Sequence, residues 1–310
     1  MFDIEFRGSV LVTVPLLLTV AACGPAADPE PQAPLPVEVI ASSVDLPVEV
    51  NGRVTRWMER FVGDQRPTFE RFMSREGLYG DMIRNKLRSR GMPEDLLYLA
   101  MIESGFQPLA RSSANAIGVW QFMGPTARDY GLRIDEYVDE RRDPVRATDA
   151  ALDYLEVLHR RFGSWHLAAA GYNAGPNRVA RVLRQHADSR TGDEELYWEI
   201  IEHLPRETRE YVPRLIAATL LAKRADEYGF SRETAEPWAF DRVWVPGGTS
   251  LARVAGSMDV PVALLRDLNP HLIRGTTPPG GSYELRVPKG ESATVVAALS
   301  RGSVRRIADD

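Results

Sequence analysis

Apolar residues recur at helical spacing from residue 54 to residue 228, and no run of alternating apolar and polar residues interrupts them. Side chains three and four positions apart fall on one face of an α-helix, whereas a half-buried strand alternates at every second residue. The spacing therefore predicts an all-α domain over residues 51–232. Hydrophobic residues make up 44% of the chain, which is enough to build a buried core.

The helix signals inside this domain centre on prolines. Pro93 stands at a first helical position and is followed by two acidic residues, so a buried apolar helix should begin there and end near Gly105. A later helix should begin at Pro205, and Pro213 should break or kink it. Other helices are expected at residues 57–61, 69–73, 82–87, 144–162, 165–170 and 177–186.

The pattern changes after residue 237 and predicts a small second domain over residues 238–290. The expected elements are strands at 243–245 and 283–287 and helices at 251–258 and 261–268. The fold class expected for the chain is therefore mainly α, with an all-α domain followed by a small α+β (βααβ) module. Residues 291–310 are expected to form a C-terminal tail.

The first fifty residues are typical of an export signal and a spacer. An apolar run at residues 10–20 is too short to span a bilayer but suits a signal peptide. It leads through small residues to Cys23, the only cysteine, in an arrangement that resembles a bacterial lipobox. We expect a lipoprotein signal peptide over residues 1–22, a lipid on Cys23, and an extended Pro-rich tether over residues 23–50. An ordinary secretory signal is the alternative.

Composition and motifs argue against several classes of protein. The net charge is −5 and no long basic run is present, which disfavours nucleic-acid binding. One cysteine excludes an intrachain disulfide, and the five histidines show no HExxH spacing, so we expect no metal and no cofactor. The sequence contains no Gly-Lys-Ser/Thr, which excludes a P-loop.

Glu103 is the residue that most suggests chemistry. It stands at the end of the apolar helix that begins at Pro93, where burial and the negative end of the helix dipole both disfavour a charged carboxylate. Both effects raise its pKa, and a carboxylic acid that stays protonated near neutral pH can act as a general acid. The alternative is a helix-end glutamate that points into water.

Three later segments contain residue types that line sites for polar, uncharged ligands. Residues 112–123 combine small residues with amides and hydroxyls, and residues 169–176 combine glycines with Tyr172 and Asn173. Residues 207–211 lie near an expected helix start. Each segment alone could instead be a loop or a turn between helices.

Taken in order, Glu103–Pro108, Ser112–Gln121, Gly171–Gly175 and Leu204–Pro213 resemble the successive motifs of the lytic transglycosylases with a goose-lysozyme-like (SLT) catalytic domain. The second domain is similar to the LysM-type modules of that family. The resemblance implies a lysozyme-like fold and a peptidoglycan substrate, cut between N-acetylmuramic acid and N-acetylglucosamine without water to leave a 1,6-anhydro ring. It implies Glu103 as the sole general acid and base. The positions that would hold the sugar or steer Glu103 are Ser112, Gln121, Tyr172, Asn173 and Tyr211.

Two other functions stay open on the residues alone. Ordinary glycosidases need two carboxylates, one on each side of the scissile bond. If a second acid faced Glu103 across that bond, the chain would be a lysozyme-like hydrolase. The acids that could supply it are Asp129, Asp135, Asp139 and Glu207. A non-catalytic peptidoglycan-binding lipoprotein is the other alternative. The expected partners are glycan strands and, through Cys23, a membrane. We expect a monomer with no nucleic acid, anchored to the outer membrane and facing the periplasm.

Overall fold

The computed structural model describes residues 44–231 and 234–308. The expected signal peptide at residues 1–22, the expected lipid site at Cys23 and most of the expected tether therefore lie outside the described residues. None of the described helices combines the length and the apolar character that a bilayer crossing requires.

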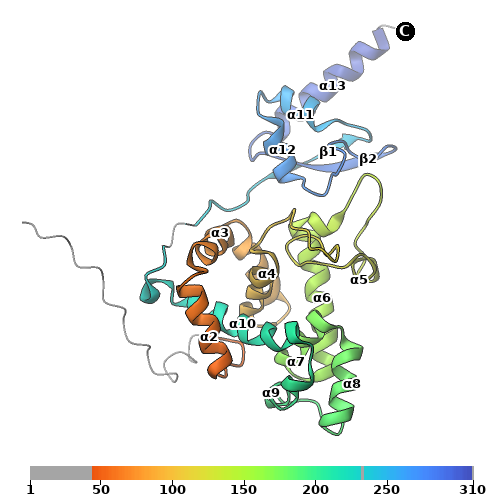
Figure 1. The fold of residues 1–310 in the computed structure, drawn as a ribbon. Coiled ribbons are helices and arrows are strands. Elements are labelled where there is room, and N and C mark those ends of the chain that lie inside the picture. Colours follow the sequence, from red (N-terminus) through yellow and green to blue (C-terminus); the bar gives the residue numbers. More distant parts are fainter. Residues whose placement is uncertain (1–43, 232–233, 309–310) are drawn as a thin grey trace, which may run out of the picture. The chain divides into compact units, whose positions relative to one another are not determined.

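The larger domain is built from helices joined by loops, as predicted (Figure 1). Its elements, in chain order, are α2 (Gly52–Val62), α3 (Arg66–Ser89), η1 (Glu94–Leu96), α4 (Leu97–Ser104), α5 (Gly124–Asp129), η2 (Glu140–Arg142), α6 (Pro144–Phe162), α7 (Trp165–Ala174), α8 (Pro176–His186), α9 (Glu195–Ile200), η3 (Ile201–His203), α10 (Arg206–Lys223) and η4 (Ala225–Tyr228). The helices surround one hydrophobic core, which confirms the prediction of a mainly α fold.

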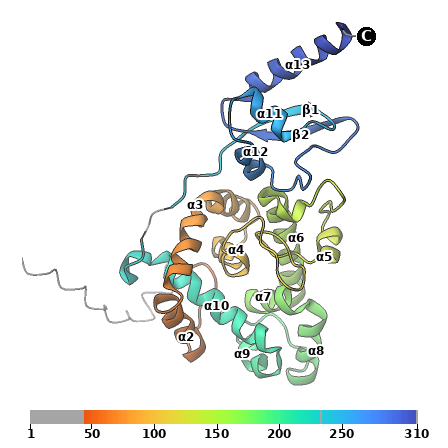
Figure 2. The same ribbon diagram turned by 45° about the horizontal axis from the view of Figure 1, so that its top comes forward.

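Helix α4 lies in the interior of this domain, with α3 and α10 packed against it (Figure 2). Every residue of α4 except Glu103 is buried, as its apolar sequence predicts. The helix ends because Gly105 takes a left-handed conformation, with φ at 59°. A side chain at Gly105 would also collide with the ring of Phe72. This C-terminal cap fixes the last turn of α4, and thereby the backbone that carries Glu103.

Helix α3 corrects one expectation. We expected separate helices at residues 69–73 and 82–87, but α3 runs unbroken through both. Its internal Gly77 serves packing between segments, because a side chain there would collide with the carbonyl oxygen of Ala235. The amide of Ala235 donates a 2.9 Å hydrogen bond to the carbonyl of Ser74, so the segment that leads to the second domain lies directly on this helix.

Helix α10 corrects a second expectation. Pro213 was expected to break or kink it, yet the helix is continuous from Arg206 to Lys223. Proline lacks an amide hydrogen and leaves the carbonyl of Arg209 without its helical donor. The hydroxyl of Tyr197 donates to that carbonyl at 3.2 Å and to the carbonyl of Thr208 at 3.0 Å. An external donor therefore replaces the hydrogen bond that Pro213 removes.

Residues 44–50 pack on the helical domain, although we expected them to belong to an extended tether. Leu46 is buried in the domain core. The Asp45 carboxylate accepts hydrogen bonds from the amides of Glu94 and Asp95 at the start of η1. The carbonyl of Pro47 lies 2.9 Å from Nε2 of the buried His166. These contacts anchor the segment that precedes α2.

The small domain has the predicted order of elements. These are β1 (Asp241–Pro246), α11 (Leu251–Ser257), α12 (Val262–Leu268) and β2 (Ser282–Val287), followed by α13 (Ser292–Ala308). The strands pair antiparallel, with Val243 opposite Leu285, and both side chains enter the core of this domain. We expected a tail after residue 290, but α13 contributes the buried Val295 to the same core. The last helix is therefore part of the module.

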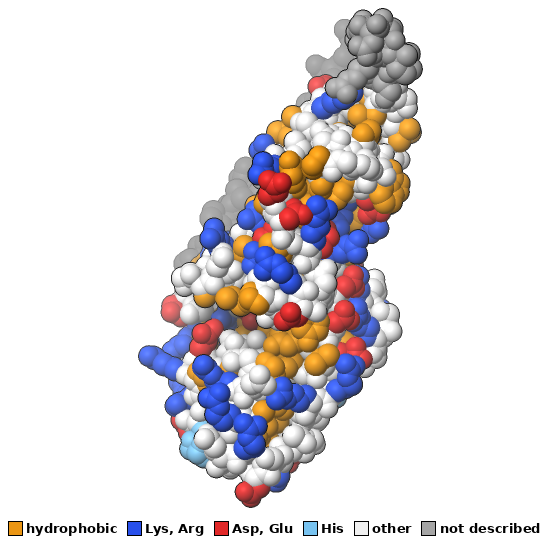
Figure 3. Space-filling model, turned by 90° about the vertical axis from the view of Figure 1, so that its right-hand side faces the viewer, with side chains coloured by type: hydrophobic (Ala, Val, Ile, Leu, Met, Phe, Trp, Pro, Cys, Tyr) orange, Lys and Arg blue, Asp and Glu red, His pale blue; other side chains and the backbone are white. Residues whose placement is uncertain are grey.

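Charged side chains of both signs are mixed on the face drawn in Figure 3. Ion pairs also form along helices, such as the one between Arg160 and Glu156 at 2.9 Å on α6. A surface on which opposite charges alternate produces no strong field of one sign.

Candidate active site

Glu103 lies in the last turn of α4 and is half-buried. Its Oε1 accepts a 2.6 Å hydrogen bond from the hydroxyl of Tyr211, which belongs to the first half of α10. Tyr211 is itself buried, so the hydrogen bond is shielded from water. The two residues are 108 positions apart in sequence, and the packing of α10 on α4 brings them together.

The surroundings of Glu103 favour its protonated form. The pKa of Glu103 is raised from 4.5 to about 7, chiefly by burial, and the negative charge of Glu207 acts in the same direction. The hydrogen bond from Tyr211 and the positive charge of Arg214 lower the pKa and so oppose part of this rise. The result is a carboxyl group that can both give and take a proton near neutral pH.

Arg214 is a site residue that the sequence analysis missed. Its guanidinium lies near Glu103 and donates a hydrogen bond to the carbonyl of Ile102, the residue before Glu103. Its Nε is buried without a hydrogen-bond partner among the described residues. The spacing of Glu207, Tyr211 and Arg214 contains a signal, because positions i, i+4 and i+7 of a helix lie on one face. On α10 this face is directed at Glu103.

Tyr172 lies near Glu103 on the last turns of α7. Burial raises its pKa well above 10, and the charge of Glu103 raises it further. Its hydroxyl donates a 2.8 Å hydrogen bond to the carbonyl of Trp120. The motif around Tyr172 is helical up to Ala174, and Gly175, where φ is 86°, forms the junction between α7 and α8.

Asn173 is held in one orientation by α10. Its Oδ1 accepts a 2.7 Å hydrogen bond from the hydroxyl of Thr208, and its Nδ2 donates a 3.1 Å hydrogen bond to Oε1 of Glu207. The structure thus brings Asn173 beside Glu207, whose charge acts on Glu103.

Ser112 and Gln121 shape the loop between α4 and α5. The Ser112 hydroxyl accepts a hydrogen bond from the amide of Ala116 at 3.0 Å. The Gln121 side-chain amide donates to the carbonyl of Gly118 at 2.9 Å and to that of Ala110 at 3.3 Å. These hydrogen bonds stay within the loop, and among the described residues neither side chain bonds to Glu103. Their ligand-lining role stays a prediction.

Two of the four acids considered as a second carboxylate are engaged by other residues. Asp135 accepts hydrogen bonds from its own loop and from Arg133, and Asp139 forms a buried ion pair with Arg141 at 2.8 Å. Asp129 is the last residue of α5. Glu207 is the one whose negative charge raises the pKa of Glu103.

Two protein families match parts of this chain. The transglycosylase SLT domain matches residues 81–194, which contain Glu103 and Tyr172. The LysM-like domain of lytic transglycosylase MltD matches residues 239–304, which include most of α13.

Several similar proteins are named as transglycosylases. Membrane-bound lytic murein transglycosylase D of Escherichia coli (strain K12) is 33% identical over 227 residues, which are 73% of this chain and 49% of that protein. Peptidoglycan transglycosylase gp16 of Escherichia phage T7 is 36% identical over 104 residues, covering 33% of this chain and 8% of that protein. The solved structure of lytic transglycosylase Slt from Pseudomonas aeruginosa is 26% identical, with a TM-score of 0.38, and covers 47% of this chain and 24% of that one.

The chain spans about half the length of its relative from Escherichia coli. The matched domains follow one another in the order in which the sequence motifs occur. Residues 81–194 are therefore similar to the transglycosylase SLT domain family, and residues 239–304 are similar to the LysM-like domain family of lytic transglycosylase MltD.

Proposed function

We propose that this protein is a lytic murein transglycosylase with Glu103 as its sole general acid and base. The observation that carries the proposal is the half-buried Glu103 carboxyl, with its pKa near 7 and its hydrogen bond from Tyr211. The SLT domain match and the names of the relatives support peptidoglycan as the substrate.

The reaction would begin with protonated Glu103. Its proton passes to the oxygen of the β-1,4 bond between N-acetylmuramic acid and N-acetylglucosamine, and that bond breaks. The acetamido oxygen of the muramic acid attacks C1 and holds the positive charge as a cyclic intermediate. The Glu103 carboxylate then takes the proton of the 6-hydroxyl, whose oxygen attacks C1. The bond between C1 and the acetamido oxygen breaks as the 1,6-anhydro ring closes, which restores the neutral acetamido group. The acid is regenerated and no water is consumed.

Tyr211 and Arg214 would act on Glu103 during this cycle. Between the two proton transfers the side chain is a carboxylate, which a hydroxyl donor and a nearby cation stabilise. Both groups lie in place for this before any ligand binds. We propose that Ser112, Gln121, Tyr172 and Asn173 hold the sugar or its N-acetyl group.

A lysozyme-like hydrolase is the second candidate, and Glu207 is the observation that favours it. Its charge acts on Glu103, so it is the acid that could activate a water molecule. Its Oε1, however, accepts a hydrogen bond from Asn173, which favours a role in orienting that amide.

We also propose a cell-envelope location, with the chain attached by a lipid on Cys23 to the outer membrane and facing the periplasm as a monomer. The name of the Escherichia coli relative, which includes "membrane-bound", supports attachment to a membrane. Labelled palmitate incorporation into the full chain and into Cys23→Ala tests the lipid.

Product analysis tests the reaction. Purified protein is incubated with intact sacculi, and the released muropeptides are analysed by mass spectrometry. We expect 1,6-anhydromuramic acid ends from the parent and no products from Glu103→Gln. Reducing ends would establish hydrolysis instead, and an inactive parent that still binds sacculi would establish a non-catalytic binder.

A further inference from the structure

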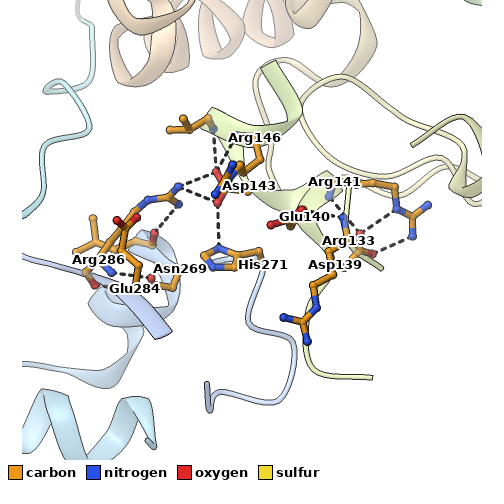
Figure 4. Close-up of polar contacts among 12 residues, drawn as sticks. Arg133, Asp139, Glu140, Arg141, Asp143, Arg146, Asn269, His271, Glu284 and Arg286 are labelled. Carbon is orange, nitrogen blue, oxygen red and sulfur yellow. Dashed lines mark hydrogen bonds and ion pairs between the residues drawn. The ribbon is translucent and has the colours of Figure 1, made fainter. Parts of the chain in front are cut away.

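The segment of residues 138–143 contacts the small module on one side (Figure 4). Val138 is fully buried and packs in the hydrophobic core of that module. It also forms an antiparallel bridge with Leu272. The amide of Asp139 donates a 2.9 Å hydrogen bond to the carbonyl of His271. A segment from the larger domain thus completes the packing of the module.

A buried ion pair closes this contact. Nη2 of Arg286 donates to both carboxylate oxygens of Asp143, at 2.9 and 2.7 Å, and both side chains are buried. Oδ1 of Asp143 also accepts the amide hydrogens of Val145 and Arg146 and so caps α6. Nδ1 of His271 lies 3.4 Å from Oδ2. Removing one partner of such a pair leaves a buried charge without compensation, which is strongly destabilising.

The same segment holds the loop between α4 and α5 on its other side. The Arg141 guanidinium is buried in an ion pair with Asp139. It also donates to the carbonyl oxygens of Asn115 at 3.2 Å and Phe122 at 3.3 Å. A side chain at Gly118 would collide with the carbonyl of Arg141, so the loop backbone lies directly against the segment.

This loop reaches the candidate active site through two of its carbonyl groups. The carbonyl of Val119 accepts a 2.8 Å hydrogen bond from the hydroxyl of Ser104, the residue after Glu103. The carbonyl of Trp120 accepts the hydroxyl of Tyr172 at 2.8 Å. Direct contacts therefore run without interruption from the module to residues that neighbour the catalytic acid.

We propose that Arg286 is a positioning residue for glycan cleavage. By pairing with Asp143 it holds the segment of residues 138–143, and this segment in turn holds the loop that carries Ser112 and Gln121. The module then contributes to the geometry of the site in addition to any binding of glycan by its own surface. The inference rests on the proposed function for its kinetic consequence, whereas its structural part does not.

The experiment compares Arg286→Met with the parent in the full chain. Hydrogen–deuterium exchange reports the protection of amides in residues 110–122, and a short soluble peptidoglycan fragment reports KM and kcat. We expect Arg286→Met to lose protection in this loop and to raise KM roughly tenfold, because a displaced loop misplaces the sugar. The alkaline limit of the pH profile, which Glu103 sets, should not move.

The matched control is Arg242→Met. Arg242 lies opposite Arg286 in the pairing of β1 with β2, but its side chain is half exposed and pairs with Glu284 at 3.3 Å. This variant should match the parent in loop protection and in KM.

A double variant covers the case in which Arg286→Met fails to fold. Asp143→Asn with Arg286→Met removes both buried charges, while the Asn oxygen can still cap α6. We expect it to recover part of the loop protection and of the KM. Parent-like exchange and KM in a folded Arg286→Met protein would overturn the proposal. If the parent leaves reducing ends, the proposed function fails, and the exchange result still decides the structural coupling.

Discussion

The hydroxyl of Tyr211 donates a 2.6 Å hydrogen bond to Oε1 of Glu103 and so joins α10 to the last turn of α4. A donor to the carboxylate favours the charged form and lowers the pKa of Glu103. In Tyr211→Phe we expect this pKa to rise above about 7, which moves the alkaline limit of kcat/KM to higher pH. The rate at the optimum should fall roughly tenfold, because the carboxylate that forms during the reaction loses a donor.

The measurement for Tyr211→Phe is the pH dependence of kcat/KM on soluble peptidoglycan fragments. Tyr228→Phe is the control, because it removes the hydroxyl of a half-buried tyrosine in η4. The control should keep the rate and the alkaline limit of the parent. An alkaline limit that stays in place in Tyr211→Phe would contradict the role given to this hydrogen bond.

The charge of Arg214, like the hydrogen bond from Tyr211, lowers the pKa of Glu103. Arg214→Met removes a cation that lowers the pKa of Glu103, so the alkaline limit should again move upward. Arg214→Lys keeps the positive charge and should lie between Arg214→Met and the parent. The same pH profiles decide the point, and identical limits in the Met and Lys variants would show that the guanidinium acts only as a packing group.

Glu103→Gln should change stability in a pH-dependent way as well as abolish turnover. Burial raises the pKa of Glu103 from 4.5 to about 7, so the folded state disfavours ionisation. Below 4.5 the parent and Glu103→Gln should be equally stable. As the pH rises through 7, the parent should lose stability relative to the variant, by on the order of 3 kcal/mol.

Urea denaturation of both proteins at about pH 4 and about pH 8 measures this difference. Glu70→Gln is a suitable control, since Glu70 forms an i, i+4 pair with Arg66 on the partly exposed side of α3. Its stability should follow that of the parent at both pH values. Equal stability of the parent and Glu103→Gln at the higher pH would contradict the raised pKa.

Tyr197 and Pro213 should be energetically coupled. Tyr197→Phe removes the donor to the Arg209 carbonyl, which Pro213 cannot serve, and should cost about 1–3 kcal/mol. Pro213→Ala restores an amide hydrogen at the position that bonds this carbonyl in a regular helix. The double variant should therefore recover much of the loss. Additive effects in thermal or urea unfolding would show that the two residues act independently.

Helix ends that carry a proline at the start or a glycine at the end could be predicted from the sequence. That a helix continues through an internal glycine or proline could not. The interval predicted for α6 agrees with the structure because Pro144 opens the helix and Gly163 closes it, with φ at 65°. The unbroken course of α3 depends on the approach of Ala235 to Gly77, and that of α10 depends on Tyr197. Contacts between distant segments leave no trace in local spacing.

The same distinction applies to the site. An acid at the end of an apolar helix indicated a raised pKa for Glu103, and family resemblance pointed to Tyr211. Their contact depends on the packing of α10 on α4, which no periodicity predicts. Arg214 shares a face of α10 with Tyr211, so helical spacing could have suggested it once Tyr211 was chosen. Gln121 has a positive φ of 49°, a conformation that residues other than glycine rarely adopt and that local spacing does not predict.

Glu103 and the groups that set its proton affinity are carried by different helices. A small outward displacement of α10 would lengthen the contact with Tyr211 and weaken the influence of Arg214 at the same time, while the desolvation contributed by α4 would persist. The carboxyl would then become a weaker acid. A titration of this single side chain, followed by NMR, would thus report how closely two helices are seated, and mutations at their contact could retune the chemistry from a distance.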